Sequence, residues 1–199
     1  MKNTSWGKTY HWGEYQEDLI LPNILRLLNL KKGEMVLDLG CGAGLFAKEF
    51  LTKGVQVIGV DISKDLIKAA QANAADGKFH IGPADDLSFL KNNSVDKITI
   101  ILAIQNIDNI NGVFAECRRV LKAGGKLFLV MNHPAFRIPK ASSWGWDEQN
   151  KIQYRRIDAY ASESLEKIKM RPGDRPEETT ISFHRSFQVY FKSLAKNYF

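Results

Sequence analysis

The stretch of residues 36–44, Val-Leu-Asp-Leu-Gly-Cys-Gly-Ala-Gly, constrains what this chain can fold into more than any other. An apolar run is followed by three glycines and then by a helix-like pattern. Glycines spaced this closely let the backbone turn sharply and let a ligand approach the main chain. A G-x-G-x-x-G dinucleotide site would need glycine where Leu45 stands, and Asp38 would repel a pyrophosphate. The stretch therefore favours a ligand with cationic groups and no phosphate.

Residues 35–133 alternate between short apolar runs and amphipathic segments, which is typical of βαβ units on a parallel sheet. The runs are continuously apolar, as expected of strands that are covered on both faces. Ser63 is a plausible N-cap for the second helix of the unit. We expect strands near 35–39, 55–60, 78–81, 95–102 and 126–132, and helices near 44–53, 63–75 and 109–122.

Three other segments surround this unit, and we expect all four to form one domain. Residues 1–34 hold an aromatic segment and a helix near 19–28, and residues 186–199 hold a C-terminal helix. Residues 134–185 are far longer than the usual loop of about 4–6 residues. They contain Trp144, Trp146, Tyr154 and Tyr160, and we expect these aromatic side chains to be buried in a lid over a substrate.

Composition bounds the surroundings of the chain. Among its 199 residues no apolar run approaches the roughly 20 residues that span a bilayer, and residues 1–6 lack the apolar core of a signal peptide. The two cysteines suggest no disulfide framework, and no metal site is predicted. We expect a cytoplasmic protein without a membrane partner. The net charge of +6 leans toward the C-terminal third, which indicates either an anionic substrate or a mildly basic solvated surface.

Two further acidic positions follow strands. Asp61 ends the second strand, where a carboxylate can accept both hydroxyls of a ribose, although it can also cap a helix. Asp85 follows the third strand in Gly82-Pro83-Ala84-Asp85-Asp86 and can accept the exocyclic amine of adenine. The alternative is that Asp85 or Asp86 caps a short helix after it.

These motifs together resemble the class I S-adenosylmethionine-dependent methyltransferases over residues 35–133. The resemblance rests on residues 37–44, on Asp61, on Ala84-Asp85 and on Arg119-Val120-Leu121-Lys122-Ala123-Gly124-Gly125, where Ala123 replaces a proline. It implies that Asp38 lies near the amino group of the cofactor, that the glycine turn packs on its methionine part and that Asp61 holds the ribose. Since the family's G-D-A-E is absent, the adenine contact falls to Asp85 or to backbone alone. The implied cofactor-binding residues are Asp38, Gly40, Cys41, Gly42, Gly44, Asp61, Ile62, Ala84, Asp85, Leu102 and Ala103.

The resemblance also implies an α/β fold, with a Rossmann-like, doubly wound and mostly parallel sheet. The family sheet has seven strands in the order 3-2-1-4-5-7-6, but this chain ends where the sixth would begin. We therefore expect a sheet of order 3-2-1-4-5 without the terminal strands. Its open edge at 126–132 would favour low solubility, pairing with another chain or coverage by the insertion. The aromatic residues Trp6, Tyr10, Trp12 and Tyr15 are similar to an entry helix over the cofactor, although packing alone would also explain them.

Candidate acceptor residues follow the fourth and fifth strands, because ligands lie beyond the carboxyl ends of parallel strands. Gln105 and Asn106 could bind a polar acceptor or cap the next helix. His133 and His184 are candidate general bases, with fixing of a strand exit as the alternative for His133. The remaining candidates are Arg137, Arg155 and Arg185 for an anionic group, or for surface ion pairs, and Trp144 as a roof of the pocket.

The sequence thus predicts transfer of a methyl group from S-adenosylmethionine to a small molecule by in-line displacement. An enclosed pocket beneath the insertion favours a small acceptor, and the absence of a [DNS]-P-P-Y motif disfavours amino groups of nucleic-acid bases. An RNA or protein methyltransferase and a truncated cofactor-binding protein without catalysis remain alternatives. An NAD-linked oxidoreductase is the least favoured reading because of Leu45 and Asp38.

Overall fold

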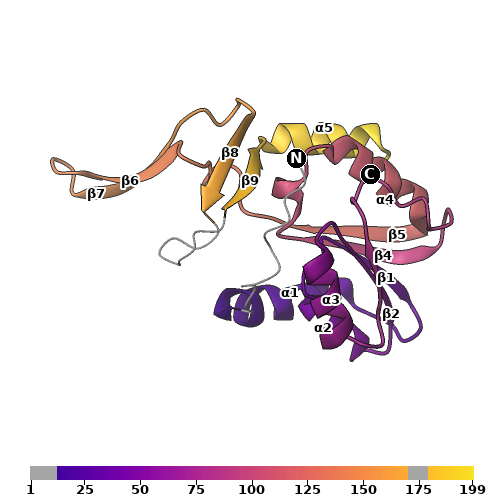
Figure 1. Ribbon diagram of the computed structural model, residues 1–199. Helices are drawn as coiled ribbons and strands as arrows, with labels where there is room; N and C mark the ends of the chain where they lie inside the picture. Colours follow the sequence, from indigo (N-terminus) through magenta and orange to yellow (C-terminus); the bar gives the residue numbers. More distant parts are fainter. Residues whose placement is uncertain (1–12, 170–178) are drawn as a thin grey trace.

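A computed structural model describes residues 13–169 and 179–199 of the chain (Figure 1). Its centre is a five-stranded parallel sheet in the order β3-β2-β1-β4-β5. This order confirms the predicted fold class. The central strands are almost completely buried, as their apolar runs predict. The bounds are β1 (Met35–Leu39), β2 (Gln56–Asp61), β3 (Lys78–Ile81), β4 (Val95–Ile101) and β5 (Leu121–Val130).

Helices cover both faces of the sheet. On one side lie a π-helical turn η2 (Tyr15–Ile20), α1 (Leu21–Leu28), α2 (Leu45–Leu51) and α3 (Lys64–Asn73), and on the other lie α4 (Ile110–Val120) and α5 (Phe187–Lys196) (Figure 1). The apolar stripes of α1 and α2 pack on β1 and β2, and Phe114 of α4 packs with Tyr190 of α5 in a second cluster. Ser63 caps α3 as predicted, since its hydroxyl accepts a hydrogen bond from the Leu66 N–H at 3.3 Å. The sheet is therefore doubly wound, and its strand ends are fixed from both faces.

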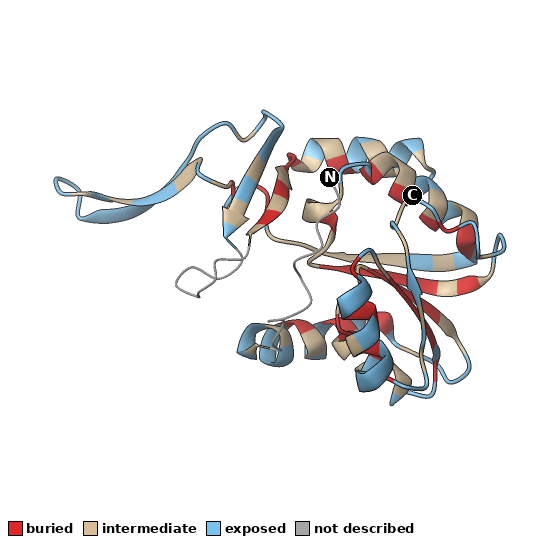
Figure 2. Ribbon diagram, viewed as in Figure 1, coloured by how far each residue is buried: buried red, intermediate tan, exposed pale blue. Residues whose placement is uncertain are grey.

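The insertion forms two antiparallel strand pairs. β6 (Ser142–Asp147) pairs with β7 (Ile152–Ile157), and β8 (Ser164–Lys169) pairs with β9 (Thr179–His184). The β6–β7 hairpin extends away from the rest of the molecule and is largely exposed (Figures 1 and 2). Trp144, Trp146 and Tyr154 are 66%, 51% and 48% exposed. The expectation that they are buried is wrong, because a lone two-stranded hairpin has no second layer on which to bury them.

Among the described strands, β5 has a single neighbour, β4, and none of β6–β9 joins its other edge. The insertion therefore does not complete the sheet within residues 13–169 and 179–199. Pairing of this edge with another chain stays a prediction. No helix in the described part of the chain combines the length and the hydrophobicity needed to cross a membrane.

Candidate active site

A cavity of about 850 Å³ lies at the carboxyl ends of the strands, as expected of an open α/β sheet. The predicted residues on its wall are Gly40, Gly42, Asp61, Ile62, Ala84, Asp85, Leu102, Ala103, Gln105, Asn106, Arg137, His184 and Arg185. Six other predicted residues are not part of this wall: Asp38, Cys41, Gly44, His133, Trp144 and Arg155. Of the predicted aromatic entry segment, Tyr15 lines the cavity, whereas Trp6, Tyr10 and Trp12 lie outside the described residues.

The glycine turn after β1 needs glycine for two different reasons. All three glycines have left-handed backbone conformations, with φ of 71° at Gly40, 55° at Gly42 and 74° at Gly44. A Cβ atom at Gly40 would lie 2.4 Å from the Cβ of Ala103, and one at Gly44 would lie 2.9 Å from the Cβ of Ala70. At Gly42, by contrast, nothing lies within 4 Å of such an atom. Gly40 and Gly44 therefore allow close packing, whereas Gly42 leaves open space on the cavity wall.

Asp61, at the end of β2, faces this turn. Its Oδ2 accepts a hydrogen bond from the Gly42 N–H at 3.0 Å, and its Oδ1 accepts one from the Ser63 N–H at 2.9 Å. Burial raises the pKa of the Asp61 carboxyl, while hydrogen bonding to the backbone of Ser63, Gly42 and Ile62 opposes that shift. Each carboxylate oxygen can accept a second hydrogen bond. Asp61 thus offers further acceptor capacity toward a ligand in the cavity.

Asp38 lies beneath the turn. It is 2% exposed, and its Oδ1 accepts a hydrogen bond from the Thr99 hydroxyl at 2.7 Å. Burial raises the pKa of Asp38 to about 7, and the nearby charge of Asp61 adds to the effect while the Thr99 hydroxyl opposes it. Its neighbour Cys41 is also buried, which raises the pKa of that thiol. Asp38 is not on the cavity wall, and its place near the amino group of a bound cofactor stays a prediction.

The loop after β3 forms the next part of the wall. Asp85 Oδ2 accepts a hydrogen bond from Asn109 Nδ2 at 2.8 Å, and Asn109 Oδ1 caps α4 by accepting the Gly112 N–H at 3.0 Å. Asp86 Oδ1 accepts the Ser88 N–H at 3.2 Å in a turn, and no helix follows it. The prediction that one of these acids caps a short helix is therefore wrong. Instead, Asp85 joins the loop to the start of α4.

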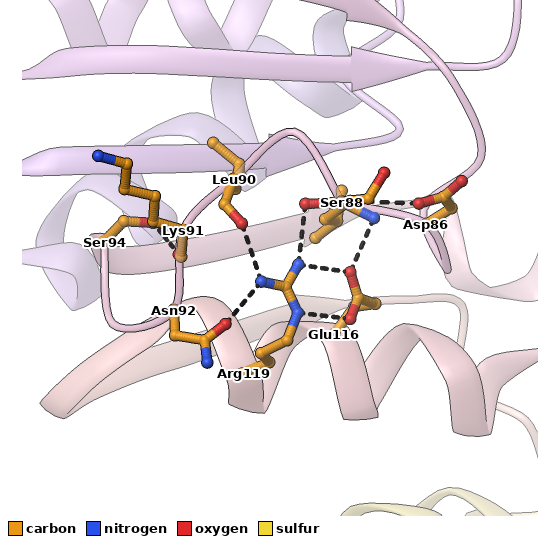
Figure 3. Close-up of polar contacts among 9 residues, drawn as sticks. Asp86, Ser88, Leu90, Lys91, Asn92, Ser94, Glu116 and Arg119 are labelled. Carbon is orange, nitrogen blue, oxygen red and sulfur yellow. Dashed lines mark hydrogen bonds and ion pairs between the residues drawn. The ribbon is translucent and has the colours of Figure 1, made fainter.

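The far side of the same loop is held by Arg119 (Figure 3). Its guanidinium forms two hydrogen bonds of 2.7 Å with the Glu116 carboxylate and donates to the carbonyls of Leu87 and Leu90, both at 2.8 Å. Glu116 in turn accepts the Leu87 N–H at 2.8 Å, and Arg119 also donates to Asn92 Oδ1 at 2.9 Å. Arg119 is part of the family-like motif at residues 119–125, but its contacts with this loop could not be predicted from that motif.

The segment after β4 contains a strained residue and an unpaired acceptor. Leu102 has a φ of 53°, which is uncommon for a residue with a side chain and marks strain at the cavity wall. Gln105 Nε2 donates to the Leu102 carbonyl at 2.7 Å. Gln105 Oε1 is buried and has no hydrogen-bond partner among the described residues. A buried acceptor of this kind costs about 1–3 kcal/mol unless a ligand supplies a donor.

Asn106 and Arg185 attach β9 to this segment. Asn106 Nδ2 donates to the Ile181 carbonyl at 2.7 Å, and Arg185 donates to the carbonyls of Ile107 at 3.0 Å and Asp108 at 2.7 Å. Arg185 is 6% exposed. Both side chains reach the wall, but their polar atoms bind the protein itself. Their contacts support a role in holding β9 over the cavity.

The two predicted histidines lie in different surroundings. His133 is exposed and outside the wall, and its Nδ1 accepts the Ala135 N–H at 3.2 Å, as its alternative role in fixing a strand exit implies. His184 is 4% exposed, lines the cavity and has Nε2 2.9 Å from the Tyr160 carbonyl. The structure therefore brings His184 and not His133 to the cavity.

The arginines and the tryptophan that were predicted to bind substrate from the insertion lie in different places. Arg155 donates to the Phe136 carbonyl and the Ser142 hydroxyl, both at 2.8 Å, and its guanidinium lies over the Trp144 ring. Arg137 lines the cavity.

Several wall residues were not predicted from the sequence, among them Asn109, Met131, Leu165 and Phe183. Asn109 was detectable as an N-cap, whereas Leu165 and Phe183 lie in short strands whose pattern gave no signal.

Comparison with known proteins agrees with this geometry. Residues 37–129, just under half of the chain, match the methyltransferase domain family. This match supports the resemblance of these residues to the class I S-adenosylmethionine-dependent methyltransferases. A solved S-adenosylmethionine-dependent methyltransferase from Mesorhizobium loti superimposes on this fold with a TM-score of 0.74 at 23% identity, covering 89% of this chain and 80% of that one.

The curated relatives that this chain resembles in sequence include two quinone-related methyltransferases. Ubiquinone biosynthesis O-methyltransferase of Xanthomonas oryzae pv. oryzae is 31% identical over 101 residues, covering 49% of this chain and 42% of that protein. Demethylmenaquinone methyltransferase of Renibacterium salmoninarum is 30% identical over 133 residues, covering 66% of this chain and 52% of that protein. The chain thus spans about half the length of these relatives.

Proposed function

We propose that this protein transfers a methyl group from S-adenosylmethionine to a small-molecule acceptor by in-line displacement. The observation on which the proposal rests is that one cavity joins Gly42 and Asp61 at one end to β8 and β9 at the other. Donor and acceptor can therefore share one enclosure. Holding two reactants in alignment raises their effective concentration to about 10⁵–10⁸ M, so alignment alone can supply most of the rate acceleration.

The residues at the sheet end of the cavity fit S-adenosylmethionine. The space in front of Gly42 is open where a side chain would fill it, and Asp61 retains acceptor capacity beside it. Asp61 would hold the ribose hydroxyls, and Asp85 would accept the adenine amine or leave that contact to backbone. Above about pH 7, where the buried Asp38 is ionised, it would add negative potential that suits a cationic ligand. When bound, the cofactor supplies a methyl group on a positively charged sulfur.

The acceptor end of the cavity supports a small molecule that carries an O–H or N–H group. Gln105 Oε1 is buried, lacks a donor, and belongs to a side chain on the wall. His184 would take the proton of such a group, since a hydrogen bond from Nε2–H to the Tyr160 carbonyl leaves Nδ1 as the acceptor nitrogen. The names of the two relatives refer to ubiquinone biosynthesis and to demethylmenaquinone, and this supports a small-molecule acceptor.

Titration calorimetry with two glycine variants tests the cofactor part. Gly42→Ala and Gly124→Ala both place a side chain at positive φ, 55° and 76°, with nothing within 4 Å of it. Both should lose about 1 kcal/mol of stability through backbone strain. Because Gly42 faces the cavity and Gly124 does not, we expect only Gly42→Ala to weaken S-adenosylhomocysteine binding, by about tenfold or more. Equal affinities of both variants, or wild-type protein that prefers NAD, would refute the proposal.

Release of S-adenosylhomocysteine then tests the acceptor. The wild-type protein and S-adenosylmethionine are incubated with a small-molecule metabolite extract, with total RNA, or with a protein mixture. We expect release with the small-molecule extract. Release that depends on RNA or protein would replace the small-molecule part of the proposal, and cofactor binding without release in any mixture would indicate a binding protein without catalysis.

A further inference from the structure

The end of the cavity farthest from Asp61 has an apolar wall. Met131, Pro134 and Pro139 follow β5, while Leu165, Ile181 and Phe183 come from β8 and β9. Leu165 and Phe183 are opposite each other in the antiparallel pair, so they present adjoining apolar surface. A volume of about 850 Å³ lies in the upper part of the range for small-molecule sites, about 300–1,000 Å³. This wall fits the body of a second ligand beside a cofactor.

Charge is unevenly distributed along the same cavity. Asp61 ends β2 and Asp85 follows β3, whereas Arg137 follows β5. Of the other charged wall residues, Asp108 lies against Arg185, and Lys169 ends β8. Neighbouring strands lie about 4.8 Å apart, so the three strand positions between β2 and β5 correspond to about 14 Å. The acidic end and the Arg137 end are therefore well separated. An anionic group would meet repulsion at the first and attraction at the second.

Arg137 differs from the neighbouring arginines in having no side-chain partner among the residues that the structure describes. Arg155 is bound to the Phe136 carbonyl and Ser142, and Arg185 is bound to the carbonyls of Ile107 and Asp108. Within residues 13–169 and 179–199, the Arg137 guanidinium makes no hydrogen bond or ion pair. It is nevertheless on the cavity wall, beside Pro134 and Pro139. A guanidinium of this kind is suited to bidentate binding of a carboxylate, sulfonate or phosphate.

We infer that the methyl acceptor has an apolar body and an anionic group, and that Arg137 pairs with that group and so determines which molecules enter. This inference rests on the proposed function, because it assigns the acceptor end of the same cavity. The apolar wall selects the body, and Arg137 selects the charge at the end away from the acids. The excess of basic residues in the C-terminal third then includes one with a specific role.

Two fluorescent probes that share an aromatic body test the inference. 1-Anilinonaphthalene-8-sulfonate carries a sulfonate, and N-phenyl-1-naphthylamine is the same ring system without it. Both are titrated into protein saturated with S-adenosylhomocysteine. We expect Arg137→Gln to weaken binding of the sulfonate about tenfold and to change binding of the neutral probe less than about twofold. Arg156→Gln is the control, since Arg156 pairs with Asp158 on the exposed hairpin away from the cavity.

The outcomes separate this inference from the proposed function. If Arg137→Gln leaves sulfonate binding unchanged, or weakens binding of both probes equally, Arg137 does not select for an anionic group and the inference is wrong. If it weakens S-adenosylhomocysteine binding instead, Arg137 belongs to the cofactor and the inference is wrong while the proposed function stands. If the wild-type protein binds no S-adenosylhomocysteine but shows the Arg137-dependent sulfonate preference without it, the proposed function fails and the anion site stands. Thermal melting of each variant shows that it is folded.

Discussion

Replacing the buried Asp38 by asparagine should remove a pH dependence from the stability of this protein. Asp38 is 2% exposed, and burial raises its pKa from 3.8 to about 7. A carboxyl whose pKa is higher in the folded state binds its proton more tightly when folded than when unfolded. Its contribution to the free energy of unfolding is therefore greatest at low pH and falls as the pH rises from about 4 to about 7.

The size of the effect follows from the two pKa values. A difference of about 3 units, at about 1.4 kcal/mol per unit, gives a loss of about 4 kcal/mol between these limits. Asparagine does not titrate, and its side-chain oxygen can still accept the hydrogen bond from Thr99. The variant should therefore gain stability relative to the wild type as the pH rises, and the difference should level off above about pH 7.

Urea denaturation of both proteins at several pH values between about 5 and 8 measures this difference directly. Carboxylates with lowered pKa values, such as Glu116 and Asp96, have the opposite effect, because the stability that they contribute is lost as the pH falls. This loss is the same in both proteins and cancels in the difference between them. Asp65→Asn on the exposed surface of α3 is the matched control. Parallel pH profiles for Asp38→Asn and the wild type would refute the reasoning and would mean that Asp38 stays ionised in the folded protein.

Three further predictions concern the cavity wall and the loop that Arg119 holds. Arg119→Lys should lower the free energy of unfolding by about 2 kcal/mol and weaken S-adenosylhomocysteine binding a few-fold, since lysine cannot make the paired contacts to Glu116. Urea denaturation and calorimetry check the two values, and unchanged values would contradict the role given to Arg119. Gln105→Met should change the free energy of unfolding by less than about 1 kcal/mol, because it removes an unpaired hydrogen-bond acceptor together with one hydrogen bond. In a turnover assay it should nevertheless raise KM for the methyl acceptor about tenfold. His184→Ala should lower kcat by about tenfold or more, whereas His133→Ala should stay within about twofold of the wild type. The reverse ranking would show that the exposed histidine is the base.

The sequence was sufficient for those features that depend on neighbours along the chain. Apolar runs located the strands because both faces of a parallel sheet are covered, and the glycines marked the turn because Gly40 and Gly44 permit contacts that no side chain would allow. The acid at the end of β2 was placed by the same rule that puts ligands beyond strand ends. The Ser63 cap is equally local, since its partner Leu66 is three residues away.

The remaining features depend on partners that are distant in sequence. Asn106 and Arg185 were read as acceptor-binding side chains, but each binds backbone 75 or more residues away. The exposure of Trp144 could not be deduced, because it depends on whether a second layer covers the hairpin. The local pattern favoured His133 over His184 because His133 follows a strand, whereas His184 is the histidine that lines the cavity. Their difference arises from how β9 lies relative to the sheet.

The segment that follows β4 links the two ends of the cavity. Leu102, with its strained backbone, lies on the cavity wall, and Gln105 donates a hydrogen bond to its carbonyl. Only a few residues later, Asn106 binds β9, and the Ile107 carbonyl accepts a hydrogen bond from Arg185, which follows β9. In the proposed function, the wall that faces the acceptor is therefore anchored to the same short segment that faces the cofactor. Occupancy of the donor end can then alter the geometry of the acceptor end through these hydrogen bonds alone, without a hinge elsewhere in the chain.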